Sequence, residues 1–116
     1  MLKVAKEADH YLVSLFQVKK LNTLFSELIS QQLEDLVSVK DRHVIFNLAH
    51  VNFIDTAGFF ALERAAGIAK ANHCVFQLCN ITDEVQELIG LTGHEGTFDI
   101  IPRLNVREKI VMELDE

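Results

Sequence analysis

Two short apolar runs, each followed by a stretch with helical periodicity, constrain most strongly what this chain can fold into. The runs are HVIFNL at residues 43–48 and CVFQLC at residues 74–79. A continuously apolar run of this length is typical of a strand that is covered on both faces, as in a parallel sheet. Strands that alternate with helices through short loops favour parallel pairing with right-handed crossovers. The pattern therefore predicts an α/β fold.

The remaining segments can be assigned around this centre. Residues 2–7 and 11–17 resemble two strands joined by a turn, which would form an N-terminal hairpin beside the parallel strands. The other expected elements are helices over about 24–39 and 57–71, a helix from Thr82 to near Gly90, a strand over 97–101 and a helix from Asn105 to about Leu114. We therefore expect one α/β domain over residues 1–116. Its mixed, mostly parallel sheet would have four or five strands, with about four helices packed mainly on one face.

Charge and hydropathy exclude several classes of partner. The net charge is −6, and Lys and Arg form no basic stripe, so direct binding of nucleic acid is not expected. No apolar run approaches the ~18 residues of a membrane span, and the first residues do not resemble a signal peptide. We expect a cytoplasmic protein. The scattered charge suits a monomer, whereas the apolar N-terminal hairpin could pair edge to edge in a weak dimer.

The motifs of common enzymes are missing from the sequence. The five histidines are spread out and have no metal-ligand spacing, and the chain contains no phosphate-binding glycine loop of the G-x-G-x-x-G or G-x-x-x-x-G-K-[ST] type. Cys74 and Cys79 lack an activating base, and their odd spacing in a strand would point them to opposite faces. Asp55 beside Thr56 is not a nucleophile–base pair, because a solvated carboxylate is too weak a base for an alcohol. The sequence predicts a binding module with no cofactor, no metal and no enzymatic activity.

The sequence DTAG at residues 55–58 joins an apolar stretch to an expected helix and allows two interpretations. In the first, Asp55 or Thr56 simply caps the helix that begins at Ala57, and Gly58 lets the helix start close to neighbouring backbone. In the second, the Thr56 hydroxyl is exposed at the carboxyl end of a strand, where open α/β sheets usually bind their ligands. A phosphoryl group there would meet free N–H groups and add about two negative charges beside Asp55.

Residues 43–101 resemble the core of a STAS domain, the family of anti-sigma factor antagonists. The resemblance rests on an apolar strand, an apolar-Asp-[Ser/Thr]-x-Gly turn, a helix, a strand that ends in an Asn-like turn, and an L-x-x-x-G turn before a last strand. The matching positions are Asp55, Thr56, Gly58, Asn80 and the segment 88–93.

This resemblance implies a role in bacterial transcription regulation by partner switching. In such antagonists, the hydroxyl residue after the Asp is phosphorylated by a serine/threonine kinase that is also the anti-sigma factor. The unphosphorylated antagonist binds the kinase and frees the sigma factor, phosphorylation ends the binding, and a phosphatase reverses the modification. Here the phosphorylated residue would be Thr56, and the partner-binding residues would include Asp55, Thr56 itself, Ala57 and Gly58.

Two departures from the family pattern affect the expected partner surface. The G-x-[LI]-D turn that many members carry before the first helix is replaced by QVKKLNTLF at residues 17–25. Phe59 and Phe60 also stand where the family usually has Leu and a small residue. We expect Phe59 to face the core, and Phe60 either to form an apolar anchor at the partner surface near Thr56 or to pack inward under a loop.

Two other functions are compatible with the same resemblance. The chain could be the cytoplasmic STAS subunit of an ABC-type lipid transport complex, a group that has a D-T-x-G turn and uses the threonine region to bind its ATPase. It could also be a nucleotide- or ligand-binding sensor module, although the missing phosphate loop argues against this reading.

Overall fold

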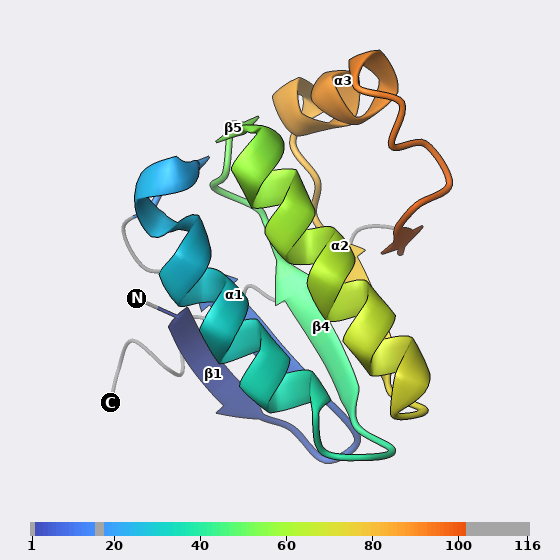
Figure 1. The fold of residues 1–116 in the computed structure, drawn as a ribbon. Coiled ribbons are helices and arrows are strands. Elements are labelled where there is room, and N and C mark those ends of the chain that lie inside the picture. Colours follow the sequence, from blue (N-terminus) through green and yellow to red (C-terminus); the bar gives the residue numbers. More distant parts are fainter. Residues whose placement is uncertain (1, 16–17, 102–116) are drawn as a thin grey trace.

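The chain forms a five-stranded sheet with two long helices on one of its faces (Figure 1). The computed structural model describes residues 2–15 and 18–101. In chain order, its elements are β1 (Leu2–Lys6), β2 (Tyr11–Leu15), β3 (Lys20–Leu21), α1 (Thr23–Val37), β4 (His43–Asn47), β5 (Phe53–Ile54), α2 (Thr56–Ala71), β6 (Val75–Cys79), α3 (Asp83–Leu91) and β7 (Asp99–Ile100).

The main sheet has the strand order β1-β2-β4-β6-β7. Strands β1 and β2 pair antiparallel, and the pairs β2–β4, β4–β6 and β6–β7 are parallel. The α/β class and the N-terminal hairpin are therefore confirmed. The central strand β4 is buried on both faces, as the apolar run HVIFNL predicted. The described residues contain three helices rather than about four, and the helix expected from Asn105 lies outside these residues.

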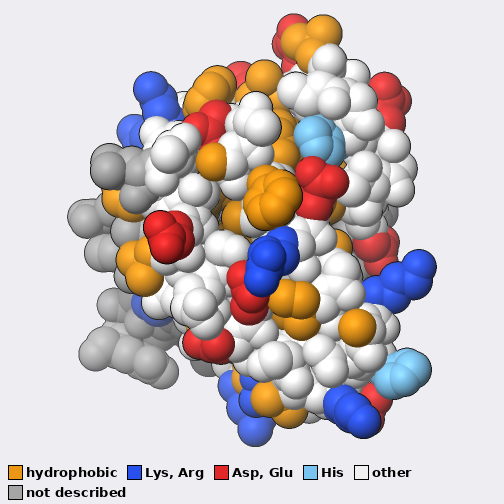
Figure 2. Space-filling view, viewed as in Figure 1, with side chains coloured by type: hydrophobic (Ala, Val, Ile, Leu, Met, Phe, Trp, Pro, Cys, Tyr) orange, Lys and Arg blue, Asp and Glu red, His pale blue; other side chains and the backbone are white. Residues whose placement is uncertain are grey.

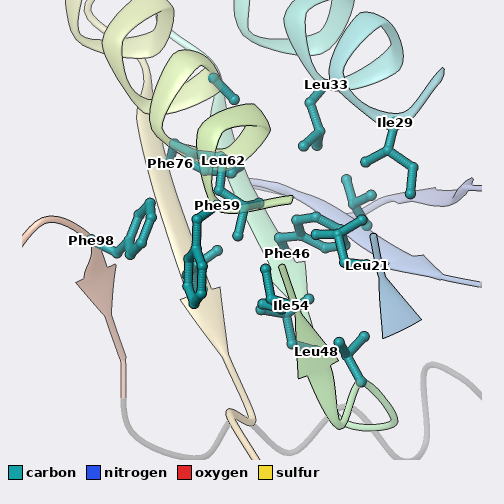
Figure 3. Packing of buried hydrophobic residues seen from close by; sticks show 14 of the residues in the cluster. Leu21, Ile29, Leu33, Phe46, Leu48, Ile54, Phe59, Leu62, Phe76 and Phe98 are labelled. Carbon is teal, nitrogen blue, oxygen red and sulfur yellow. The ribbon is translucent and has the colours of Figure 1, made fainter. Parts of the chain in front are cut away.

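The larger part of the core lies between the sheet and the pair α1 and α2. The helix expected over about 24–39 is α1, and its apolar stripe faces this core, with Ile29, Leu33 and Val37 completely buried. Phe46 of β4 points toward these helices, and Phe59 of α2 lies beside Phe98 (Figure 3). A smaller cluster on the opposite face of the sheet is formed by Leu12, Ile45 and Cys79.

A second, two-stranded sheet pairs β3 with β5 in parallel, Lys20 opposite Phe53 and Leu21 opposite Ile54. Neither segment is among the strands expected from the sequence, so this sheet was not predicted. Its hydrogen bonds include Asp55 N–H to the Leu21 carbonyl at 3.1 Å. Because β3 precedes α1 and β5 precedes α2, the pairing places the N-termini of both helices at the same end of the molecule (Figure 1).

The two cysteines lie in different environments. Burial raises the pKa of the Cys79 thiol to about 11. Cys74 is only partly buried, and its thiol donates a hydrogen bond to the Val39 carbonyl at 3.0 Å. Both thiols are free.

Within residues 2–15 and 18–101, no helix is long and apolar enough to cross a membrane.

Candidate functional site

Asp55 connects the N-termini of two helices through one carboxylate. Its Oδ1 accepts a hydrogen bond from the Gly58 N–H at 2.8 Å and thereby caps α2. Its Oδ2 accepts from the backbone N–H of Thr23 at 2.9 Å and from the Thr23 hydroxyl at 3.0 Å, at the first residue of α1. The capping interpretation of the DTAG sequence thus holds for Asp55, and α2 begins at Thr56, one residue earlier than expected.

The same contacts determine the charge of Asp55. Partial burial acts to raise the pKa of the carboxyl, but the hydrogen bonds from Gly58, Thr23 and the Ala57 N–H outweigh it. The pKa of Asp55 therefore lies below its usual value, since each of these donors stabilises the carboxylate form. The site carries a fixed negative charge over the whole physiological range.

Thr56 is the first residue of α2, and its side chain is exposed. Its hydroxyl makes no hydrogen bond to another residue in the described part of the chain, because Asp55 supplies the cap. Among the described residues, the cap of α2 is thus supplied by Asp55, and the Thr56 side chain is exposed to solvent.

Gly58 explains why this junction needs a residue without a side chain. A Cβ at this position would overlap the carbonyl oxygen of Leu21 and lie 2.8 Å from Cγ2 of Ile54. The first turn of α2 therefore lies directly against the β3–β5 sheet. The expectation that Gly58 permits a close approach of backbone is confirmed.

Phe59 and Phe60 point in different directions. Phe59 is 2% exposed and stacks on the ring of His94 with 4.5 Å between the ring centroids. Phe60 is 64% exposed, although large aromatic side chains are mostly buried in folded proteins. The alternative in which Phe60 packs inward is therefore wrong, whereas its role as an anchor for a partner stays a prediction.

An open groove with a volume of about 750 Å³ runs between α1 and α2 from this junction. The face formed by the two helices shows apolar side chains among acidic and basic ones (Figure 2). The residues that line the groove are Thr23, Ser26, Glu27, Ser30, Gln31, Glu34, Asp55, Thr56, Ala57, Phe60, Ala61 and Arg64. Four of the five predicted site residues line it, and Gly58 lies beneath them against β3.

The contribution of α1 to this site was not predicted from the sequence. Arg64 of α2 donates through Nε to Oε2 of Glu34 at 3.0 Å, and the Ser30 hydroxyl donates to the same oxygen at 3.0 Å. These residues come from separate helices, so the spacing rules for a single helix do not pair Glu34 with Arg64.

Comparisons with known proteins agree with the fold. Residues 4–108 match the STAS domain family. No curated protein sequence matches the chain. An anti-sigma-factor antagonist (STAS) domain protein from Planctomyces limnophilus has 18% identity and a TM-score of 0.79, with 99% of this chain and 98% of that chain covered. An anti-sigma factor antagonist from Mycobacterium paratuberculosis has 16% identity and a TM-score of 0.75, with 100% and 94% covered.

A third solved structure is the cell fate determinant SpoIIAA of Bacillus in its phosphorylated form. It has 12% identity and a TM-score of 0.64, with 98% of this chain and 99% of that chain covered. Identities this low show a shared fold. Since the family match covers nearly the whole chain, this protein belongs to the STAS domain family.

Proposed function

We propose that this protein is an anti-sigma factor antagonist that binds a serine/threonine kinase acting as the anti-sigma factor, and that reversible phosphorylation of Thr56 switches the binding. The observation that carries the proposal is the division of roles at the start of α2. Asp55 caps two helices, while the neighbouring Thr56 hydroxyl is exposed and makes no hydrogen bond to another described residue. A kinase can reach this hydroxyl without disturbing the fold.

The chemistry of the modification belongs to the kinase. Oγ1 of Thr56 attacks the γ-phosphorus of ATP, the hydroxyl proton passes to a base of the kinase, and ADP leaves. Asp55 does not serve as that base, because both of its oxygens already accept hydrogen bonds and its pKa is low. The antagonist is thus a substrate and binding partner, with no enzymatic activity of its own.

The structure also suggests how a phosphoryl group would end the binding. It would stand at the N-terminus of α2, where the helix dipole tolerates it, and would add about two negative charges beside Asp55. In the complex, it would face the phosphates of the kinase nucleotide, which carry charge of the same sign. It would also bring a bulky hydrated group one helical turn from Phe60. A phosphatase that removes the group restores the original surface.

The first experiment is a pull-down from cells of the source organism. The tagged wild type is compared with Thr56→Ala and Thr56→Glu, and Thr97→Glu adds the same charge at an exposed site on another loop. We expect a kinase of the anti-sigma type to be retained by the wild type, Thr56→Ala and Thr97→Glu, and to be lost with Thr56→Glu. Equal retention by Thr56→Glu would refute the switch. Recovery of an ABC ATPase or permease would instead assign the protein to lipid transport.

A further inference from the structure

We propose that the groove between α1 and α2 receives an amphipathic helix of the partner protein, whose apolar face contacts Phe60 and whose lysine or arginine side chains pair with Glu27. Thr56 is one of the residues that line the groove, and the inference therefore takes the identity of the partner from the proposed function. It adds the chemistry by which that partner is recognised.

The groove exists because small side chains face each other where the two helices meet. Ser26 and Ser30 on α1 and Ala57 and Ala61 on α2 are the small residues that line it, and the two buried ones, Ser26 and Ala61, mark its floor. Larger side chains on both helices stand above this floor as walls. Two neighbouring helices with such a furrow offer the ridge-and-groove surface on which a third helix packs.

Phe60 supplies the apolar contact of one wall. Its side chain is 64% exposed and lines the groove together with the small residues Ala57 and Ala61 of the same helix. Exposed aromatic side chains that become buried at an interface frequently contribute a large share of the binding energy. An occupant must therefore present apolar side chains along the groove, as one face of an amphipathic helix does at positions i, i+3, i+4 and i+7.

The charged residues that line the groove determine which side chains the bound helix carries beside its apolar face. Glu34 is already paired with Arg64 at 3.0 Å, and Asp55 accepts hydrogen bonds from Thr23 and Gly58. Glu27 is exposed and has no partner among the described residues. The groove thus holds three carboxylates and one guanidinium, in a chain whose net charge is −6. Electrostatic complementarity requires Lys or Arg beside the apolar face of the occupant.

This preference for a basic occupant is consistent with loss of binding after phosphorylation. The phosphoryl group would stand in the groove itself, one helical turn from Phe60, and would exclude by its size the apolar face of the helix, whatever the charges along its edges.

The test is an NMR titration of ¹⁵N-labelled full-length protein with a synthetic helical peptide that has leucine on one face and lysine along its edges. A peptide with glutamate in place of lysine is the charge control. We expect the lysine peptide to shift the amide resonances of residues 26–34 and 56–64, and the glutamate peptide to leave them unchanged. Equal binding of both peptides, no binding, or shifts confined to α3 would overturn the inference.

Variants locate the contact. We expect Glu27→Lys and Phe60→Ala each to raise the Kd of the lysine peptide at least about fivefold, equivalent to about 1 kcal/mol. Glu87→Lys, which makes the same change at another exposed carboxylate, on α3, should change it less than about twofold. An equal effect of Glu87→Lys would show that only the net charge matters and would overturn the inference. Amide spectra without peptide verify that each variant is folded.

The inference and the proposed function can fail separately. If the cellular kinase binds Glu27→Lys as well as the wild type, the function stands and the groove is not the docking site. If no kinase is captured while the titration maps to the groove, the proposed function fails and the recognition chemistry stands.

Discussion

Replacing Asp55 tests the central element of the site, one carboxylate that joins two helix termini. In Asp55→Ala, α2 loses its cap at Gly58, and α1 loses both hydrogen bonds from Thr23. In Asp55→Asn, the single amide oxygen still caps α2, but the amide nitrogen cannot accept a hydrogen bond from Thr23. The two variants therefore separate the contributions of the two helices.

The magnitudes follow from the number of donors that lose their acceptor. A cap of this kind contributes about 1 kcal/mol, and hydrogen bonds to a charged group about 1.5–3 kcal/mol. We expect Asp55→Ala to lower the free energy of unfolding by about 2–3 kcal/mol, and Asp55→Asn by about half as much. Asp83→Ala, an exposed carboxylate in the first turn of α3, is the control and should cost less than about 1 kcal/mol.

The pH dependence has a definite sign. The pKa of Asp55 in the folded state lies below the value of about 3.9 in an unfolded chain. Its stabilisation is therefore complete above about pH 4 and is lost as the pH falls through the lower folded-state pKa. Urea unfolding at pH 7 and at about pH 3 measures both effects, with a midpoint shift of about 1 M expected for Asp55→Ala at pH 7. Equal midpoints for the Ala and Asn variants, or a difference from wild type that does not shrink in acid, would refute the reasoning.

Three further predictions concern neighbouring residues. Gly58→Ala should lower the free energy of unfolding by about 1–3 kcal/mol, because the added methyl group would overlap the Leu21 carbonyl oxygen of β3. An unchanged thermal midpoint would contradict this close contact. Phe59→Ala should lower the free energy of unfolding by about 3–5 kcal/mol, and Phe60→Ala by less than about 0.5 kcal/mol. Urea unfolding measures both values, and similar losses would show that Phe60 is packed. Iodoacetamide at pH 8 should label Cys74 well before Cys79, whose thiol stays protonated. Mass spectrometry of the labelled peptides gives the order, and faster labelling of Cys79 would contradict the prediction.

The predictable parts of this fold were those that depend on local periodicity. The runs HVIFNL and CVFQLC became β4 and β6, and the apolar stripe of α1 became part of the core. The start of α3 was also found, because Thr82 caps it through a hydrogen bond from the Val85 N–H at 3.3 Å. Each of these features is encoded within a few neighbouring residues.

The parts that could not be predicted depend on contacts between distant segments. Strands β3 and β5 have two residues each, too few to produce a periodic pattern. The link between Thr23 and Asp55 follows from their pairing and leaves no trace in either local sequence. The exposure of Phe60 was left open for a similar reason, since it depends on which side of α2 faces α1.

The β3–β5 pairing also has a consequence for when the site comes into existence. It joins Lys20 to Phe53 and Leu21 to Ile54, which α1 and β4 separate in the chain, so the ladder can close only after the chain has been synthesised beyond Ile54. A nascent or unfolded chain contains the sequence DTAG, yet in it the Asp55 carboxylate does not join the two helix termini, and the groove between α1 and α2 does not exist. A partner that recognises this surface therefore requires a completed tertiary structure, and we expect it not to bind an incompletely synthesised or misfolded copy.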